Sequence, residues 1–331
     1  MRYNGKKRTA VFSLMLLLAL TSISGCGRNT KEAGNEHSKS YVAVITKSTT
    51  SEYWKTTFAG ANAASAEYHM EVTFNGPENE EDYETENDMV RAAVKDGADA
   101  IVFSAVDYNA NAKAINEAVE AGVKVVVIDS DVNSDLVSCR ISTDNYKAGQ
   151  MVGNAVLEGA EESINVGIVN FDKNSENGQQ REKGFRDQVE GNSRVNIISS
   201  VNVNSTTEEA KAATIKMIED NPQINIIVTF NEWTSLGVGY AVQELGLADA
   251  VRVVAFDSNV VSVGMLETGE VDALIVQNPY AMGYLGVEYA SMLINGEKLK
   301  ETDIDTTTTL ITRENMYEPG SQKVLFPFEQ N

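Results

Sequence analysis

The sequence predicts an α/β protein made of two doubly wound parallel-sheet lobes. From Tyr41 onward, short runs rich in β-branched residues alternate with longer segments of helical period, which is typical of a parallel sheet with crossover helices. The alternation falls into two blocks, one ending near Ile141 and the other near Gln277. About 290 residues follow the N-terminal segment, which is more than one hydrophobic core usually holds, so two lobes are expected.

Several predicted strands are apolar throughout, as expected where helices cover both faces of a sheet. The strands are expected at Tyr41–Ile45, Glu71–Phe74, Ala100–Phe103, Val123–Ile128, Asn165–Asn170, Val195–Val201, Ile224–Phe230, Val251–Phe256 and Ala273–Val276. The helices between them are expected at Tyr53–Tyr68, Asp82–Lys95, Asn109–Ala121, Tyr146–Glu158, Gln180–Gln188, Thr207–Ile218, Ser235–Leu245, Val260–Thr268 and Tyr280–Ile294. Gly97, Gly122, Gly246 and Gly296 follow helices, where left-handed backbone is commonly needed.

The first 40 residues predict export and lipid anchoring. Four cations precede the uncharged run Ala10 to Leu20, which is shorter than the roughly 20 apolar residues that span a bilayer. The run leads to Ile23-Ser24-Gly25-Cys26, the pattern of a bacterial lipoprotein cleavage site. We therefore expect a signal peptide over residues 1–25, a lipidated Cys26, a polar tether over 26–40, and an extracytoplasmic protein anchored to the cell membrane.

Composition argues against several classes of function. The formal charge is −21, and loss of the four signal-peptide cations takes it to −25, which disfavours nucleic acid and favours neutral or cationic ligands. Besides Cys26 the only cysteine is Cys139, so the mature domain forms no internal disulfide. His37 and His69 are too few for a histidine-based hydrolase or zinc site, and no metal, cofactor or catalytic residue is expected.

An acidic run from Glu80 to Asp88 precedes and begins a predicted helix. Acidic residues favour that end of the helix dipole, so a solvated helix face is expected there and not a metal site. A second acidic stretch, Asp129 to Asp135, alternates like a calcium loop. Ser134 replaces the glycine that such a loop needs, so calcium is not expected.

Polar and aromatic side chains recur where the predicted strands end. Ligands of open α/β sheets bind at these carboxyl ends, where loops lead into helices. Each residue alone is explained by turn formation or helix capping, but nearly every such position in both blocks carries one. The candidate ligand-binding residues are Ser51, Tyr53, Trp54, Ser104, Asp129, Gln179, Arg181, Asn204, Asn231, Asp257 and Gln277.

Short motifs follow one another in a specific order and spacing between Tyr41 and about Thr312. They are Tyr53-Trp54 with Phe58-Ala59-Gly60-Ala61, Val125-Val126-Val127-Ile128-Asp129, Ser142-Thr143-Asp144-Asn145 with Ala148-Gly149, Arg181-Glu182-Lys183-Gly184-Phe185, Phe230-Asn231-Glu232, Val253-Val254-Ala255-Phe256-Asp257 and Ala273-Leu274-Ile275-Val276-Gln277. With this set the chain resembles the periplasmic sugar-binding proteins of the ribose and galactose type, which have the type I periplasmic-binding fold.

The resemblance implies how the chain divides between the lobes. The N-terminal lobe would hold residues 41–144 plus 279–307, and the C-terminal lobe residues 145–278 plus 308–331. Three crossings near Asp144, Asn278 and Thr306–Thr308 would form the hinge, which closes on the ligand.

The resemblance also implies roles for the candidate residues. Tyr53 and Trp54 would sandwich a sugar ring, and Arg181 would add a donor from the second lobe. Hydrogen bonds to the sugar hydroxyls would come from Asp129, Asn231, Asp257 and Gln277. Ser130, Thr50-Ser51 and Gln179 depart from the ribose-type pattern, so ribose itself is not the expected ligand. An unusual or larger neutral sugar, a polyol and a nucleoside fit this set of residues about equally well.

The resulting hypothesis is a monomeric solute-binding lipoprotein that captures a small polar ligand and delivers it to an ABC permease in the membrane. A sensory binding protein that presents the ligand to a membrane receptor or kinase would use the same pocket. An enzyme such as a glycosidase would instead turn its ligand over. A transcription regulator is disfavoured because a signal segment stands where a helix-turn-helix would be needed.

Overall fold

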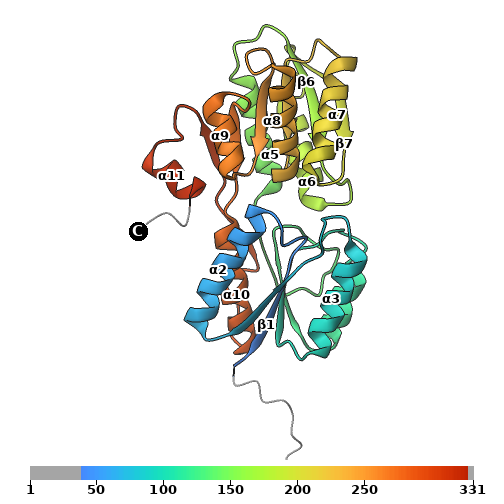
Figure 1. The fold of residues 1–331 in the computed structure, drawn as a ribbon. Coiled ribbons are helices and arrows are strands. Elements are labelled where there is room, and N and C mark those ends of the chain that lie inside the picture. Colours follow the sequence, from blue (N-terminus) through green and yellow to red (C-terminus); the bar gives the residue numbers. More distant parts are fainter. Residues whose placement is uncertain (1–38, 327–331) are drawn as a thin grey trace, which may run out of the picture. The chain divides into compact units, whose positions relative to one another are not determined.

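The computed structural model describes residues 39–326, which contain two six-stranded sheets, each in its own α/β lobe (Figure 1). The predicted signal peptide and Cys26 lie outside the described residues. Within the described part of the chain, no helix is long and apolar enough to cross a membrane.

The first sheet is entirely parallel and has the strand order β11-β5-β4-β3-β1-β2. Its strands are β1 (Tyr41–Ile45), β2 (Glu71–Asn75), β3 (Ala100–Phe103), β4 (Lys124–Ile128), β5 (Cys139–Ser142) and β11 (Asp303–Asp305). Helices α2 (Glu52–Tyr68) and α10 (Pro279–Ile294) cover one face, and α3 (Tyr83–Lys95) and α4 (Ala112–Glu120) cover the other. We call this unit the first lobe.

The second sheet has the order β12-β10-β9-β8-β6-β7 and is parallel except for β12. Its strands are β6 (Ile164–Asn170), β7 (Val195–Asn202), β8 (Ile226–Thr229), β9 (Arg252–Phe256), β10 (Ala273–Val276) and β12 (Thr309–Thr312). One face packs on α5 (Asn145–Leu157) and α6 (Glu176–Val189), and the other on α7 (Thr207–Asp220), α8 (Glu232–Leu245), α9 (Val260–Thr268) and α11 (Pro319–Leu325). This is the second lobe.

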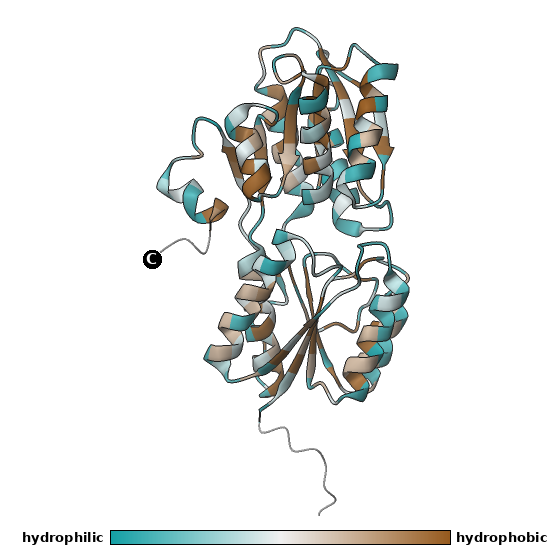
Figure 2. Cartoon of the chain, viewed as in Figure 1, coloured by the Kyte–Doolittle hydropathy of each residue, from teal (hydrophilic) through white to brown (hydrophobic). Residues whose placement is uncertain are grey.

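The strands are apolar on both faces because each divides its side chains between two cores. In β1, Ala43 and Ile45 face the core under α3 and α4, whereas Val42 and Val44 face the core under α2 and α10. This period-2 division requires every position to be hydrophobic. Figure 2 shows the strands of both sheets in hydrophobic colours, with hydrophilic loops at their ends.

In each lobe, a glycine allows two neighbouring helices to pack in close contact. A Cβ at Gly60 of α2 would lie 2.0 Å from the carbonyl oxygen of Tyr280 at the start of α10. Likewise, a Cβ at Gly149 of α5 would lie 2.0 Å from the carbonyl oxygen of Arg181 in α6. No side chain fits at either crossing, so these glycines allow α2 and α6 to approach their partner helices closely.

Three connections join the two lobes. β5 of the first lobe ends at Ser142 just before α5 of the second, β10 ends at Val276 before α10, and β11 ends at Asp305 before β12. The connections are bonded to one another: Thr143 Oγ1 donates to Gln277 Oε1 at 2.8 Å, and Thr306 N donates to Ser142 O at 2.8 Å.

The nine predicted strands and nine predicted helices are all present, with ends shifted by a few residues. The sequence interpretation missed β5, β11, β12 and α11, which are short elements near the crossings or at the C-terminal end. The prediction of a solvated acidic face is wrong for Glu80 and Glu86, which are both buried. Glu86 Oε2 accepts from Val106 N at 2.9 Å, and burial raises the pKa of this carboxyl well above its ordinary value.

Candidate functional site

A narrow cavity lies where the carboxyl ends of the two sheets face each other. Residues of both lobes line it: Lys47, Ser51, Tyr53, Trp54, Glu80, Asp129, Phe171, Asn177, Arg181, Asn231, Glu232, Trp233, Asp257 and Gln277. A second, larger cavity of about 250 Å³ lies beside it on the hinge side and shares Tyr53, Asp257 and Gln277. We take the first as the candidate site because the strand ends of both lobes converge on it.

Two lining residues owe their position to helix capping. Ser51 is the N-cap of α2 and its side chain accepts from Trp54 N. Asn231 is the N-cap of α8 and forms a capping box with Thr234. Ser51 and Asn231 therefore both cap a helix and line the cavity, because a helix that starts just after a strand begins at the carboxyl end of the sheet.

Asp129 lies directly after β4 with left-handed backbone, φ 56°. Its carboxylate accepts from Tyr53 Oη at 2.8 Å and from Ser104 Oγ at 3.1 Å. Asn177 Nδ2 of the second lobe approaches both carboxylate oxygens at 3.4 and 3.5 Å. Burial raises the pKa of Tyr53 well above its ordinary value, so its hydroxyl stays a donor to Asp129.

Asp257 holds the matching position after β9, with φ 65°. Its side chain accepts from Gln277 Nε2 at 2.7 Å, the sole side-chain donor to it among the described residues. Burial raises the pKa of Asp257 to about 7, opposed by the nearby guanidinium of Arg181 and reinforced by the charges of Glu232 and Asp129. A buried carboxylate with so few partners is suited to accept hydrogen bonds from a ligand.

The aromatic residues do not lie as the resemblance implies. The Tyr53 and Trp54 rings have centroids 4.9 Å apart and an interplanar angle of 87°. Rings in edge contact leave no room for a sugar between them, so these two residues do not form the expected sandwich. Phe171 and Trp233 of the second lobe line the same cavity as Trp54, so flat surfaces come from both lobes.

Arg181 is 1 % exposed and its donors point to the protein. It donates to Asn145 Oδ1 at 2.8 Å, to the Phe230 carbonyl at 2.7 Å and to Gln277 Oε1 at 2.6 Å. Its guanidinium also lies 4.5 Å from the centroid of the Phe256 ring. Arg181 thus holds Gln277, which in turn donates to Asp257, and organises the second lobe's side of the cavity.

Three of the eleven predicted binding residues do not line the cavity. Ser104 is buried behind Asp129 as its donor. Gln179 is exposed on α6, because residues two positions apart on a helix point in nearly opposite directions and Arg181 points inward. Asn204 is exposed and donates from Nδ2 to Glu209 Oε1 at 3.1 Å, so its side chain supports the start of α7.

Six lining residues were not among the candidate binding residues: Lys47, Glu80, Phe171, Asn177, Glu232 and Trp233. Of these, Asn177 lies in the loop 174–181, which the sequence places at a strand end. Lys47 follows β1 by two residues and Phe171 follows β6 directly, so the rule about strand ends, applied strictly, would have found both. Glu232 accepts from Asn259 Nδ2 at 2.8 Å and from Tyr53 N of the first lobe at 3.2 Å, and burial raises its pKa. No sequence signal distinguished Glu80 from the other acidic residues of the run from Glu80 to Asp88.

The arrangement is suited to binding. Buried carboxylates and amides supply hydrogen-bonding groups and aromatic rings supply flat apolar walls, the combination that small polar ligands need. Among the described residues, no group of three or more His, Cys, Asp or Glu side chains could hold a metal ion. Fold and cavity together define a two-lobed binding protein with an interlobe site.

Comparison with known proteins identifies the family to which this binding protein belongs. Residues 42–298 match the periplasmic binding protein domain, so the chain belongs to that family, whose members are binding proteins. It is 26 % identical to the D-ribose/D-allose-binding protein of Pseudomonas aeruginosa, over 92 % of this chain and 99 % of that protein.

Two solved structures are also similar. A carbohydrate transporter solute-binding protein from Agrobacterium radiobacter, in complex with D-arabinose, has 28 % identity and a TM-score of 0.84, covering 87 % of this chain and 99 % of that one. An ABC transporter solute-binding protein from Agrobacterium vitis, with bound D-fucose, has 29 % identity and a TM-score of 0.83, covering 86 % and 100 %.

Proposed function

We propose that this protein captures a sugar in the interlobe cavity and delivers it to an ABC importer without chemical turnover. The observation that carries the proposal is the cavity itself, where buried carboxylates from both lobes stand beside aromatic rings from both lobes. The similar proteins from Agrobacterium hold D-arabinose and D-fucose, and one is an ABC transporter component. The sensory alternative is not favoured by these relatives.

In this proposal the sugar ring lies between Trp54 of the first lobe and Phe171 of the second. The apolar faces of the ring pack on these side chains, and the hydroxyl groups point toward Asp129, Asp257 and Asn231. Carboxylates form charge-assisted hydrogen bonds, which are roughly twice as strong as neutral ones. Gln277 and Arg181 contribute by holding Asp257 in place.

The test is a thermal-shift screen against D-ribose, D-allose, D-arabinose, D-fucose and D-tagatose, with polyols and nucleosides as further classes. A ligand at a hundred times its Kd adds about 2.7 kcal/mol to the free energy of unfolding. Trp54→Ala and Phe171→Ala should each abolish most of the shift caused by the best sugar. Stabilisation by a nucleoside alone, or conversion of the bound sugar to a product, would contradict the proposal.

Closure of the lobes about the three crossings is part of the same proposal, with the lobes divided as residues 41–144 plus 279–307 and 145–278 plus 308–331. Hydrogen bonds between Tyr53 N and Glu232, and between Tyr108 N and the Asn174 carbonyl, cross the cleft and support a closed arrangement. Small-angle scattering should show a smaller radius of gyration with saturating sugar. An unchanged radius would argue against hinge closure.

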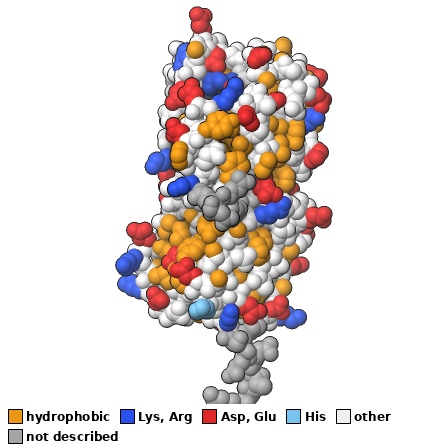
Figure 3. Space-filling model, turned by 60° about the vertical axis from the view of Figure 1, so that its left-hand side comes forward, with side chains coloured by type: hydrophobic (Ala, Val, Ile, Leu, Met, Phe, Trp, Pro, Cys, Tyr) orange, Lys and Arg blue, Asp and Glu red, His pale blue; other side chains and the backbone are white. Residues whose placement is uncertain are grey.

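Delivery requires a membrane partner, and the proposal includes an anchored monomer. The face turned forward in Figure 3 carries hydrophobic side chains on both lobes, and α9 exposes Val260 and Val261. A permease that recognises the closed form needs such surface on both lobes. Anchoring through Cys26 predicts that Cys26→Ala yields unprocessed or unanchored protein, and unchanged membrane association and processing would refute the anchor.

A further inference from the structure

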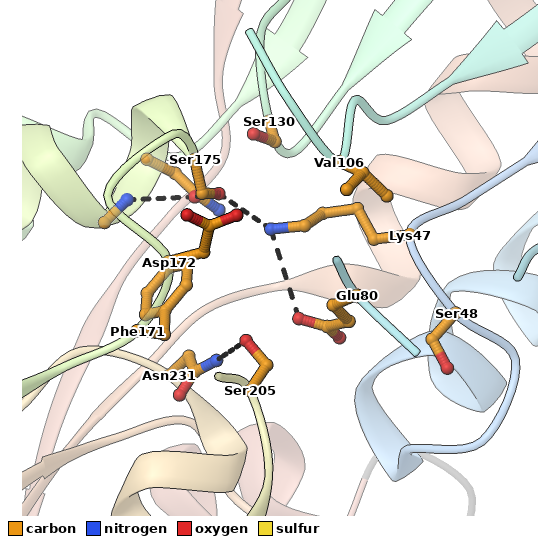
Figure 4. Close-up of polar contacts among 12 residues, drawn as sticks. Lys47, Ser48, Glu80, Val106, Ser130, Phe171, Asp172, Ser175, Ser205 and Asn231 are labelled. Atoms are coloured by element: carbon orange, nitrogen blue, oxygen red, sulfur yellow. Dashed lines mark hydrogen bonds and ion pairs between the residues drawn. The ribbon is translucent and has the colours of Figure 1, made fainter. Parts of the chain in front are cut away.

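Lys47 occupies an unusual position for a lysine. It is 2 % exposed and belongs to the first lobe, yet its Nζ donates to Ser175 Oγ of the second lobe at 2.7 Å (Figure 4). Nζ also lies 5.1 Å from the centroid of the Phe171 ring and 4.0 Å from Glu80 Oε2. Burial of an ammonium group costs free energy unless the group is paired, so this crossing contact needs an explanation.

Stabilisation of α6, the helix that begins at Ser175, does not explain the contact. Ser175 is the N-cap of α6, but its side chain makes no capping hydrogen bond. Instead its hydroxyl accepts from Lys47 and donates to Asn177 Oδ1 at 2.7 Å. A cation at a helix N-terminus is also unfavourable for the helix dipole. The contact therefore does not stabilise α6. It links the first lobe to the second.

The contact continues in both directions to groups that face the cavity. On one side, Glu80 Oε1 accepts from Trp54 Nε1 at 2.9 Å and so fixes the orientation of the indole ring. On the other side, Asn177 reaches from the second lobe back to the carboxylate of Asp129. The chain of contacts from Glu80 through Lys47, Ser175 and Asn177 to Asp129 thus crosses the cleft twice.

We propose that Lys47 is a positioning residue that sets the residence time of the ligand, because its bond to Ser175 holds the lobes closed while Glu80 holds the Trp54 wall. The proposal rests on the sugar binding proposed above. It predicts that loss of Lys47 acts on the dissociation rate constant. The association rate constant should change little, because the open form that admits the ligand lacks the crossing bond.

The test uses the full chain and whichever of D-ribose, D-allose, D-arabinose, D-fucose and D-tagatose raises the Tm most. Both tryptophans of the chain, Trp54 and Trp233, line the cavity, so stopped-flow tryptophan fluorescence reports on binding directly. Lys47→Met should raise the dissociation rate constant about tenfold, as expected for loss of a hydrogen bond to a charged group, and leave the association rate constant within about twofold. Lys47→Arg should restore part of the loss.

A double-mutant cycle separates closure from direct contact with the sugar. Ser175→Ala should raise the dissociation rate constant nearly as much as Lys47→Met, and the double variant should be no worse than Lys47→Met alone. Lys55→Met, which removes an exposed lysine of α2, is the matched control and should bind like the parent. If Lys47→Met fails to fold, Ser175→Ala carries the test by itself.

Multiplicative effects of the two substitutions, or a loss confined to the association rate constant, would overturn the role of Lys47 and leave sugar binding intact. Absence of binding by the parent protein to every sugar tested would instead contradict the proposed function.

Discussion

The carboxyl ends of β4 and β9 present the same residue in the same backbone conformation but in different surroundings. Asp129 and Asp257 both follow a buried strand, both have positive φ and both are 5 % exposed. Asp129 accepts from side chains of both lobes, whereas Asp257 accepts from Gln277 alone among the described side chains. The fold thus repeats the strand-end position and the backbone conformation of the aspartate. The neighbouring side chains decide how many acceptor positions of each carboxylate are left for a ligand.

The largest effect is expected for Asp129→Ala. The substitution removes a ligand acceptor and also leaves the donors of Tyr53, Ser104 and Asn177 without their partner. An unpaired buried group costs about 1–3 kcal/mol, so we expect sugar affinity to fall about a hundredfold and the Tm to fall with it. Calorimetry and thermal unfolding measure the two effects, with exposed Asp249→Ala as the control.

A smaller effect is expected for Asp257→Ala. Only Gln277 loses a side-chain partner, so affinity should fall about tenfold with little loss of Tm. Asp257→Asn should lie between the variant and the parent, because asparagine tolerates left-handed backbone and still accepts a hydrogen bond. Equal losses of affinity and stability at Asp129 and Asp257 would remove the difference between the two sites.

Stability should depend on pH through Asp257. Its folded-state pKa of about 7 lies above the ordinary value of 3.8. The contribution of this carboxyl to the free energy of unfolding is therefore fully present below about pH 4 and is lost as the pH rises through 7. The slope is at most about 1.4 kcal/mol per pH unit. Denaturant unfolding of the parent and Asp257→Asn between pH 4 and 8 should show the parent falling relative to the variant. Parallel curves would contradict the raised pKa.

A still smaller loss of affinity is expected for Ser104→Ala, and none for Gln179→Ala. Ser104 lies behind Asp129 and supplies one of its hydrogen bonds, so affinity for the sugar should fall only about threefold to fivefold. Gln179→Ala should bind like the parent, because Gln179 is exposed outside the cavity. Calorimetry of both variants tests this order, and a larger loss at Gln179 than at Ser104 would reverse it.

The sequence predicted the strands of both cores because their hydrophobic pattern depends only on alternation between two covered faces. It missed β11, whose residues Asp303–Asp305 are largely polar and pair with β5 only because the chain returns to the first lobe there. Glu80 shows the same limit within the site. Its neighbours in sequence are also acidic, and its burial follows from contacts with Trp54 and Lys47, 26 and 33 residues away.

The sequence by itself determined the two α/β blocks, the glycines that follow helices, and the polar residues that follow the strands, since each depends on local periodicity or on one residue type. The tertiary structure decided which of those polar residues meet. It set Tyr53 and Trp54 at right angles, turned the donors of Arg181 toward the protein, and brought Lys47 to Ser175, 128 residues further along the chain. The contact between Lys47 and Ser175 joins the two lobes across the cleft, so its geometry depends on how the lobes meet. The other two contacts depend on packing within one lobe, and no local sequence pattern encodes any of the three.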